Sequence, residues 1–266
     1  MDMNLAVGMA SDNEMAGAIE ELVALFKMDE KIDRLCASVV GGVEHDRNSI
    51  PATAFNRYKE IVVSSFDSLN LRRDIRKIIS ESYDVDNFKE FIDSLRGSKI
   101  SLMSQCEEDA KSPDVMLDMQ AFFSGLQASP PTEDRKRLIE GIDKVKHFSS
   151  IVVNTQIELF RVITRGTRGL RGADLKASED QLNQTVSSMK KEMGAHIERQ
   201  VWTGMLYAYK DISDADLESY LLLCETDSVK SVDGFMREAY LSMHENVVNT
   251  LQYELRLVFD CYSNNA

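Results

Sequence analysis

The sequence contains few of the residues that interrupt helices. Only 4 prolines and 13 glycines occur among its 266 residues. Folds made of short strands need frequent turns, and glycine and proline supply much of that turn chemistry. The sequence also shows no sustained alternation of apolar and polar residues bounded by hairpin turns. These absences argue against an all-β fold and favour long helices.

A long apolar run and an excess of positive charge are also absent. No stretch approaches the roughly 20 apolar residues that a transmembrane helix needs, so we expect no such segment. The 44 acidic and 31 basic residues give a formal net charge of −13. Because an acidic surface repels the phosphate backbone of nucleic acids, we expect an acidic protein that does not bind them.

Motifs for catalysis and for metal binding are missing as well. The histidines His45, His147, His196 and His244 are scattered, and none belongs to an H-E-x-x-H motif. The sequence has no G-x-x-x-x-G-K-[ST] phosphate-binding loop, no G-x-S-x-G elbow and no C-x-x-C pair. We therefore predict no catalytic, cofactor-binding or metal-binding residue and interpret the protein as non-catalytic.

Helical periodicity covers most of the chain. Apolar residues recur at steps of three and four over residues 182–205 and again over 232–258. Pro51 is expected to open a helix, and the apolar face that follows it consists of Phe55, Tyr58, Val62 and Phe66. The expected fold is all-α, a helical bundle with two related helical halves that share long helices.

Capping signals and breaks divide these helices. Capping boxes are expected at "SDNE" (11–14) and "SEDQ" (178–181), and Thr132 is expected to cap a further helix. A break is expected near Asp29, and Gly41-Gly42 is expected to end the first helical arm.

Pro130-Pro131 marks the clearest boundary in the chain, since two prolines cannot lie inside a helix. It separates an N-terminal half (13–127) from a C-terminal half (132–263). Residues 1–12 are expected to form a disordered start or the remnant of an export signal, because a short apolar run ends there in Gly8-Met9-Ala10.

A Gly/Arg-rich loop is expected at 164–177. Arg165, Arg168 and Arg171 occur at every third residue among glycines. Exposed guanidinium groups of this kind are candidates for contact with an anion such as a phosphate or an acidic headgroup. A solvated flexible linker is the alternative interpretation.

Four cysteines, Cys36, Cys106, Cys224 and Cys261, bear on the compartment. An even number suits two disulfides in an oxidising compartment, with three connectivities open. Four buried thiols in a cytosolic helical protein are equally compatible with the composition.

Two segments resemble each other in design. Residues 84–103 and 213–232 each show a capped start, a short amphipathic helix, a small or polar break and a further helix. They indicate an internal repeat. In the second segment Ser213 and Asp216 are expected to form a capping box, and "ETDS" (225–228) is expected to end one helix and cap the next.

These segments are similar to a helical domain-of-unknown-function family that is common among exported proteins of proteobacteria. The phrase "FIDSLRGSKI" resembles the family phrase "WLDSPLGRRI" through Phe91, Asp93, Ser94, Gly97 and Ile100. The phrase "YAYKDISDADLESYLLLCETDS" resembles a second family phrase through Tyr207, Tyr209, Leu217, Tyr220, Glu225 and Thr226. Leu95 replaces a usual proline, and no glycine follows Thr226, so the geometry of the second turn departs from the family pattern.

The resemblance implies a helical envelope protein and supplies no activity. We therefore expect a periplasmic binding or structural module whose partner is a protein or another envelope component. The exported context favours disulfides, and pairing Cys36 with Cys106 and Cys224 with Cys261 would place one in each half. The alternative is a cytoplasmic scaffold or regulator that binds a partner protein through an amphipathic groove.

Overall fold

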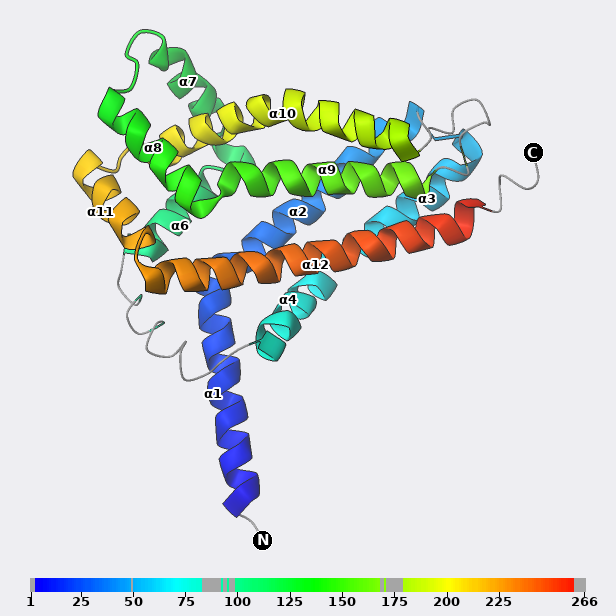
Figure 1. Ribbon diagram of the computed structural model, residues 1–266, viewed down its shortest axis with the longest axis horizontal. Coiled ribbons are helices and arrows are strands. Elements are labelled where there is room, and N and C mark those ends of the chain that lie inside the picture. The colour runs from blue at the N-terminus through cyan, green and yellow to red at the C-terminus, as the bar shows by residue number, and fades with distance from the viewer. Residues whose placement is uncertain are drawn as a thin grey trace. The chain divides into compact units, whose positions relative to one another are not determined.

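The computed structural model describes residues 3–48, 50–82, 92, 95, 99–167, 170 and 179–260, and these residues contain helices and no strand. The α-helices (Figure 1) are α1 (Met3–Leu25), α2 (Met28–Gly42), α3 (Ala52–Ser65), α4 (Ser68–Ser82), α6 (Lys99–Asp109), α7 (Met116–Leu126), α8 (Glu133–Lys146), α9 (Phe148–Gly166), α10 (Glu179–Ala208), α11 (Asp214–Cys224) and α12 (Asp227–Phe259). Short 3₁₀ helices lie at η1 (Val43–Asn48) and η2 (Pro113–Val115). The prediction of an all-α helical bundle is confirmed.

Several helix ends lie where the sequence places them. Thr132 caps α8 by accepting a hydrogen bond from the Arg135 amide at 3.1 Å, and Ser213 caps α11 by accepting one from the Asp216 amide at 3.1 Å. The Thr226 hydroxyl accepts from the Val229 amide at 3.4 Å, at the start of α12. The "ETDS" segment therefore ends one helix and caps the next, as expected.

The first helix differs from the expectation. α1 begins at Met3, ahead of the "SDNE" pattern and within the residues 1–12 expected to be disordered. A capping box is a local preference, and the surrounding Leu, Ala and Met residues favour helix strongly enough to continue it. The helix ends instead at Leu25, and Lys27 adopts a left-handed conformation (φ 51°) that separates α1 from α2.

The chain forms two compact units. Unit 1 consists of Met1–Lys31, Ile75–Phe148 and Arg199–Ala239. Unit 2 consists of Ile32–Asp74, Ser149–Glu198 and Tyr240–Ala266. These units differ from the predicted halves 13–127 and 132–263, because each unit joins segments from the start, the middle and the end of the chain. The long helices α10 and α12 contribute residues to both units.

In unit 1 the core forms where α8 packs against α11. A Cβ atom on Gly141 would lie 2.8 Å from Cδ2 of Leu221, so glycine allows the close approach of the two helices. The Arg135 guanidinium donates to the carbonyl oxygens of Tyr209 (2.6 Å) and Ile212 (2.8 Å) and thereby joins α8 to the segment before α11. Both carbonyls lie beyond the end of α10, and that of Tyr209 also accepts from the Ile212 amide at 2.9 Å.

In unit 2 the core is mainly apolar. The predicted face of α3 is buried in full, at Phe55, Tyr58, Val62 and Phe66. A close approach also occurs between α9 and α12, because a Cβ atom on Gly166 would lie 2.7 Å from Cβ of Leu255. The periodicity of the sequence therefore predicts the inward faces of this unit well.

Candidate functional site

The predicted anion-binding arginines do not form a site among the described residues. Arg165, at the end of α9, makes an ion pair with Glu179 at the start of α10. Arg168 and Arg171 lie outside the described residues. The positive charge of Arg165 is therefore neutralised within unit 2, which weakens the prediction that this side chain contacts an anion.

No disulfide joins the described cysteines. Cys36, Cys106 and Cys224 are free thiols, and Cys261 lies outside the described residues. Cys36 and Cys106 belong to different units, and the even number of cysteines gave no information about which thiols meet. Burial raises the pKa of the Cys36 thiol and of the Cys224 thiol to about 11, so both are protonated and unreactive at neutral pH.

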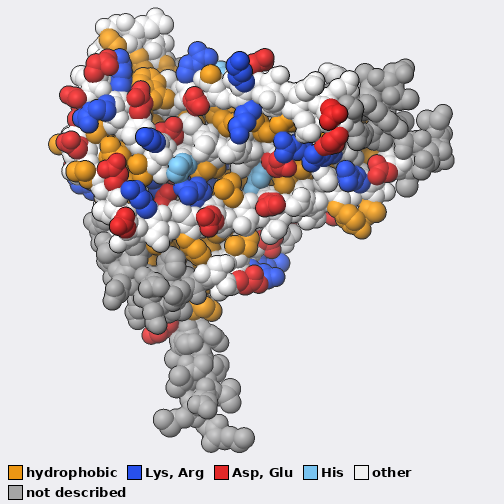
Figure 2. All heavy atoms as spheres, in the orientation of Figure 1, with side chains coloured by type: hydrophobic (Ala, Val, Ile, Leu, Met, Phe, Trp, Pro, Cys, Tyr) orange, Lys and Arg blue, Asp and Glu red, His pale blue; other side chains and the backbone are white. Residues whose placement is uncertain are grey.

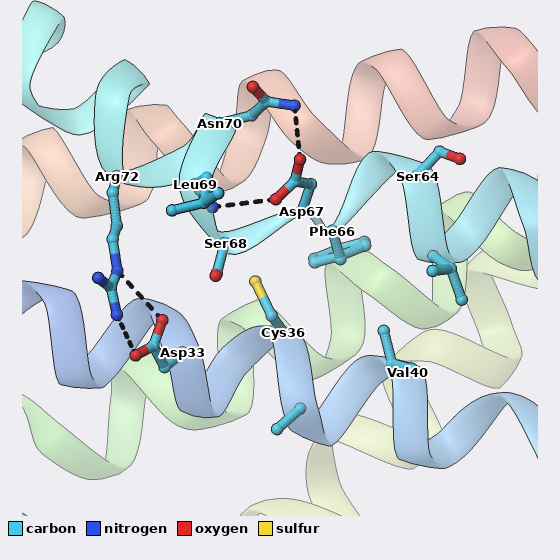
Figure 3. Close-up of a pocket in the computed structure, with 12 residues that line it drawn as sticks. Asp33, Cys36, Val40, Ser64, Phe66, Asp67, Ser68, Leu69, Asn70 and Arg72 are labelled. Carbon is cyan, nitrogen blue, oxygen red and sulfur yellow. Dashed lines mark hydrogen bonds and ion pairs between the residues drawn. The ribbon is translucent and has the colours of Figure 1, made fainter.

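An open groove of about 840 Å³ lies in unit 2 between α2, the end of α3 and the start of α4 (Figure 3). Its lining includes the Cys36 thiol, the Ser68 hydroxyl and the ring of Phe66. The two carboxylates of the groove are already engaged. Asp67 caps α4 by accepting from the Leu69 amide and from Asn70, both at 3.0 Å, and Asp33 pairs with Arg72. The groove therefore has one carboxylate in an ion pair and one held by neutral amide donors.

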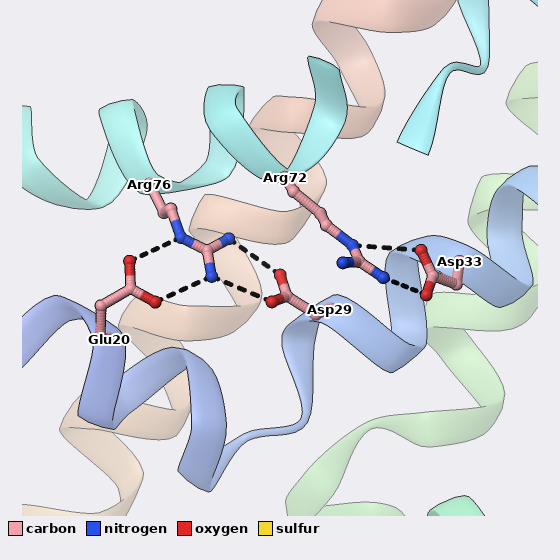
Figure 4. A network of polar contacts seen from close by, with 5 residues as sticks. All are labelled: Glu20, Asp29, Asp33, Arg72 and Arg76. Atoms are coloured by element: carbon pink, nitrogen blue, oxygen red, sulfur yellow. Dashed lines mark hydrogen bonds and ion pairs between the residues drawn. The ribbon is translucent and has the colours of Figure 1, made fainter. Parts of the chain in front are cut away.

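Ion pairs on α4 brace each unit separately (Figure 4). In unit 1 the Arg76 guanidinium lies between Glu20 and Asp29, with nitrogen–oxygen distances of 2.7 to 2.9 Å. The hydrogen bonds from Arg76 lower the pKa of Glu20. In unit 2 Arg72 forms a two-point contact with Asp33, in which Nε lies 3.1 Å from Oδ1. These fork-shaped contacts fix the geometry of neighbouring helices.

Unit 1 buries a cluster of polar side chains, which we name the buried polar cluster: Glu107, Lys146, Tyr209, Tyr220 and Asp233. The Glu107 carboxylate accepts hydrogen bonds from the hydroxyls of Tyr209 (2.6 Å) and Tyr220 (3.2 Å). Lys146 pairs with Asp233, and its ammonium lies 5.5 Å from the centre of the Phe26 ring, in the turn between α1 and α2. Five separate segments of the chain thus supply the groups that meet here.

The electrostatics of the cluster follow from its burial. Burial and the Glu107 charge raise the pKa of both tyrosines well above the ordinary value, so they act as hydrogen-bond donors at all physiological pH values. Burial opposes the charge of Lys146, but Asp233 and Glu107 outweigh it and raise the pKa of that ammonium. The buried lysine is therefore charged and paired.

Lys31 lies at the edge of this cluster and behaves differently. Burial lowers its pKa most, and the positive charges of Lys111 and Lys146 lower it further against the opposing effect of Glu107. The result is a pKa of about 7, although the side chain is only half-buried. Amines with such values serve as bases or nucleophiles in some enzymes. The groove described above is lined by residues of unit 2, and none of them belongs to this cluster.

Metal binding is not indicated in the described part of the chain. No group of three or more histidine, cysteine, aspartate or glutamate side chains is placed there to hold an ion. His244 is buried with 3% of its surface exposed, and its Nε2 atom has no hydrogen-bond partner among the described residues. Burial alone lowers the pKa of His244 to about 4, so this ring is neutral at pH 7.

The helix α7 is apolar and yet exposed. Its sequence, "MLDMQAFFSGL", contains a single charged residue, and none of its residues is buried. Met116 and Leu117 expose 58% and 79% of their surface, the latter the highest value among the large apolar residues described. A Cβ atom on Gly125 would meet nothing within 4 Å, which confirms the open surroundings of this helix.

An aromatic contact attaches α7 to α10 in unit 1. The Phe122 ring packs edge-on against Tyr207, with ring centres 5.6 Å apart, and within α7 it lies 5.9 Å from the Phe123 ring. In the space-filling view, hydrophobic side chains are visible at the end where Figure 1 draws α7 and α8 (Figure 2). A helix that buries so little apolar surface is unusual in a monomeric protein. Nothing in the sequence pattern indicates the exposure of this helix.

Most of the first segment of the predicted repeat lies outside the described residues. In the first segment this applies to Phe91, Asp93, Ser94 and Gly97. In the second segment Leu217 and Tyr220 belong to the core of unit 1, as does Tyr209 of the second family phrase. The resemblance to the exported helical family and the repeat therefore stay predictions.

No helix among the described residues combines the length and apolar character needed to cross a membrane. Comparisons with protein-family models, with curated proteins and with solved structures found no match to this chain.

Proposed function

We propose that this protein is a non-catalytic helical module of the bacterial envelope that binds a partner protein through α7. The observation behind this proposal is that α7 is apolar and that none of its residues is buried. Contiguous apolar surface on a protein commonly marks an interaction site, since leaving it in water costs free energy that association recovers. The resemblance to exported helical proteins supports the envelope as the location.

The polar groups of the protein support a non-catalytic role. In the buried polar cluster, Glu107 is held by two tyrosines and Lys146 by Asp233. Catalytic groups need access to a substrate, and a site normally offers a concave pocket beside them. The groove described above is lined only by residues of unit 2, and both of its carboxylates already accept hydrogen bonds or form an ion pair. The cluster is therefore interpreted as a structural element of unit 1.

Photo-cross-linking in living cells tests the proposal. A photoreactive amino acid at position 117 is compared with the same residue at position 257, because Leu257 in unit 2 is also exposed, at 59%. We expect a discrete protein adduct from position 117 and none from position 257. Equal adducts from both positions, or none from position 117, would contradict the proposal.

The free thiols favour a second location. Cys36, Cys106 and Cys224 are free, and such thiols are typical of a reducing compartment. The second candidate is thus a cytoplasmic scaffold that uses the same α7 surface. Cell fractionation separates the two locations, and mass spectrometry under non-reducing conditions establishes whether the thiols are free in the native protein.

A further inference from the structure

We propose that the partner docks a basic amphipathic helix against α7. This inference rests on the proposed function and adds the chemical character of the partner. The surface concerned, which we name the α7 surface, consists of the exposed side chains Met116, Leu117 and Asp118 together with the half-buried Met119 and Phe123.

The charge expected of the partner follows from the composition of the segment that contains α7. Residues 112–131 contain Asp114 and Asp118 and no lysine, arginine or histidine. The basic residues at its flanks have acidic partners. Lys111 pairs with Glu108 at 2.8 Å, and after the segment Arg135, Lys136 and Arg137 pair with Asp214, Glu133 and Asp134. The α7 surface is thus apolar with an acidic border, in a chain of net charge −13. A complementary surface is apolar with a basic border.

The architecture determines the conformation of the partner. The described residues contain no strand, so they provide no sheet edge to which an extended peptide could add. An exposed apolar helix is instead complementary to another helix, whose side chains interdigitate with its own. Methionine side chains are flexible and adapt to such a neighbour. The 11 residues of α7 extend over about 16 Å, enough to contact roughly three turns of a partner helix.

Other occupants fit the α7 surface less well. A second copy of the chain would bring the acidic borders of two α7 helices together, and like charges would oppose that association. An anionic lipid surface would be repelled by the same aspartates and by the net charge. A basic helix would instead be attracted by these aspartates and by the net negative charge.

Binding of designed peptides to the full chain tests the inference. The probe is a labelled amphipathic helical peptide of leucine and lysine, about 18 residues long, and its counterpart replaces every lysine by glutamate. Fluorescence anisotropy is measured with the wild type, L117D and the control L257D. We expect the Leu–Lys peptide to bind the wild type, the Leu–Glu peptide to bind at least about tenfold more weakly, and L257D to resemble the wild type.

The variant L117D separates apolar docking from simple charge attraction. It adds a negative charge, so attraction alone would tighten the binding of the Leu–Lys peptide. Loss of the apolar contact should instead weaken binding about tenfold. The substitution D118K should also weaken binding of the Leu–Lys peptide and strengthen binding of the Leu–Glu peptide. Circular dichroism verifies that each variant is folded.

The inference would be overturned by unchanged or tighter binding of the Leu–Lys peptide to L117D, by equal binding of both peptides, or by absence of peptide binding. It would also be overturned if the wild type dimerises with increasing concentration, or binds phosphatidylglycerol vesicles, and L117D abolishes that association. If the Leu–Lys peptide fails while cross-linking from position 117 captures a protein, the proposed function stands and only the character of the partner is wrong.

Discussion

The buried polar cluster and the α7 surface belong to the same unit and invert the usual distribution of side chains. Inside unit 1, Glu107 and Lys146 are 5% and 8% exposed, whereas on its surface Leu117 is 79% exposed. Buried charges are tolerated when they are paired and hydrogen-bonded, and those of the cluster are. On the α7 surface, in contrast, the described residues leave apolar side chains such as Leu117 exposed to water. This difference is the reason to assign a structural role to the first region and a binding role to the second.

The largest loss of stability is expected at the ion pair between Lys146 and Asp233 in unit 1. Replacing Lys146 by methionine should lower the stability of unit 1 by about 3–5 kcal/mol, because Asp233, whose side chain is only 12% exposed, is left without its counter-charge. The double variant K146M/D233L should recover much of this loss. Urea unfolding followed by the fluorescence of Trp202, the single tryptophan and a residue of unit 1, measures both. A double variant as unstable as the single one would show that the pair is not isolated from other charges.

A second prediction contrasts the cluster with a buried polar group that lacks a partner among the described residues. The pKa of His244 is about 4 in the folded protein and 6.5 in the unfolded chain. The unfolded chain therefore binds more protons between these values, and stability falls as the pH drops from about 7 to 4, by roughly 3 kcal/mol. Unfolding measured by far-ultraviolet circular dichroism across this range should show that decrease. The variant H244M should show a smaller decrease, and equal pH profiles would contradict the assignment.

The hydrogen bonds within the cluster should contribute less. Replacing Tyr209 by phenylalanine removes one of the two hydroxyls that donate to buried Glu107, and should cost about 1–3 kcal/mol. Tyr253, which is 64% exposed, provides the matched control, because its replacement by phenylalanine should change stability by less than about 0.5 kcal/mol. Equal effects of Y209F and Y253F would mean that the hydroxyl of Tyr209 is not engaged in solution.

The smallest effect on folding is expected at the α7 surface. Because Leu117 is exposed, L117D should change the stability of unit 1 by no more than about 0.5 kcal/mol. The same variant is expected to reduce partner binding, so stability and binding would separate. A loss of several kcal/mol in thermal or urea unfolding would show that Leu117 is buried in the native protein, which would remove the basis for a binding role.

Much of the fold follows from the sequence because helices depend on local patterns. The periodic residues after Pro51 and the caps Thr132 and Ser213 lie as predicted. The buried polar cluster could not be predicted in the same way, since its members come from segments far apart in the chain. Tyr209 and Tyr220 match positions of a family phrase, but nothing in their spacing indicates that both contact Glu107.

The exposure of α7 also escapes sequence reasoning, for a physical reason. An apolar helix looks the same in a sequence whether it lines a core or awaits a partner, because periodicity does not reveal which faces are covered. The compact units show a related limit. Pro130-Pro131 interrupts the helices as expected, yet segments on either side of it belong to unit 1. Local breaks determine where helices end, and packing determines which helices associate.

Hydrogen–deuterium exchange tests the central claim, a binding role for α7, most directly. Exchange is measured on the full chain alone and with the Leu–Lys peptide at saturating concentration. A binding role for α7 predicts faster exchange in α7 than in α8 or α11 of the free protein, because α7 has no buried residue. It also predicts slower exchange over residues 112–127 once the peptide is bound. If α7 is already as protected as α8 in the free protein, or if the peptide protects other helices and leaves α7 unchanged, the account is contradicted.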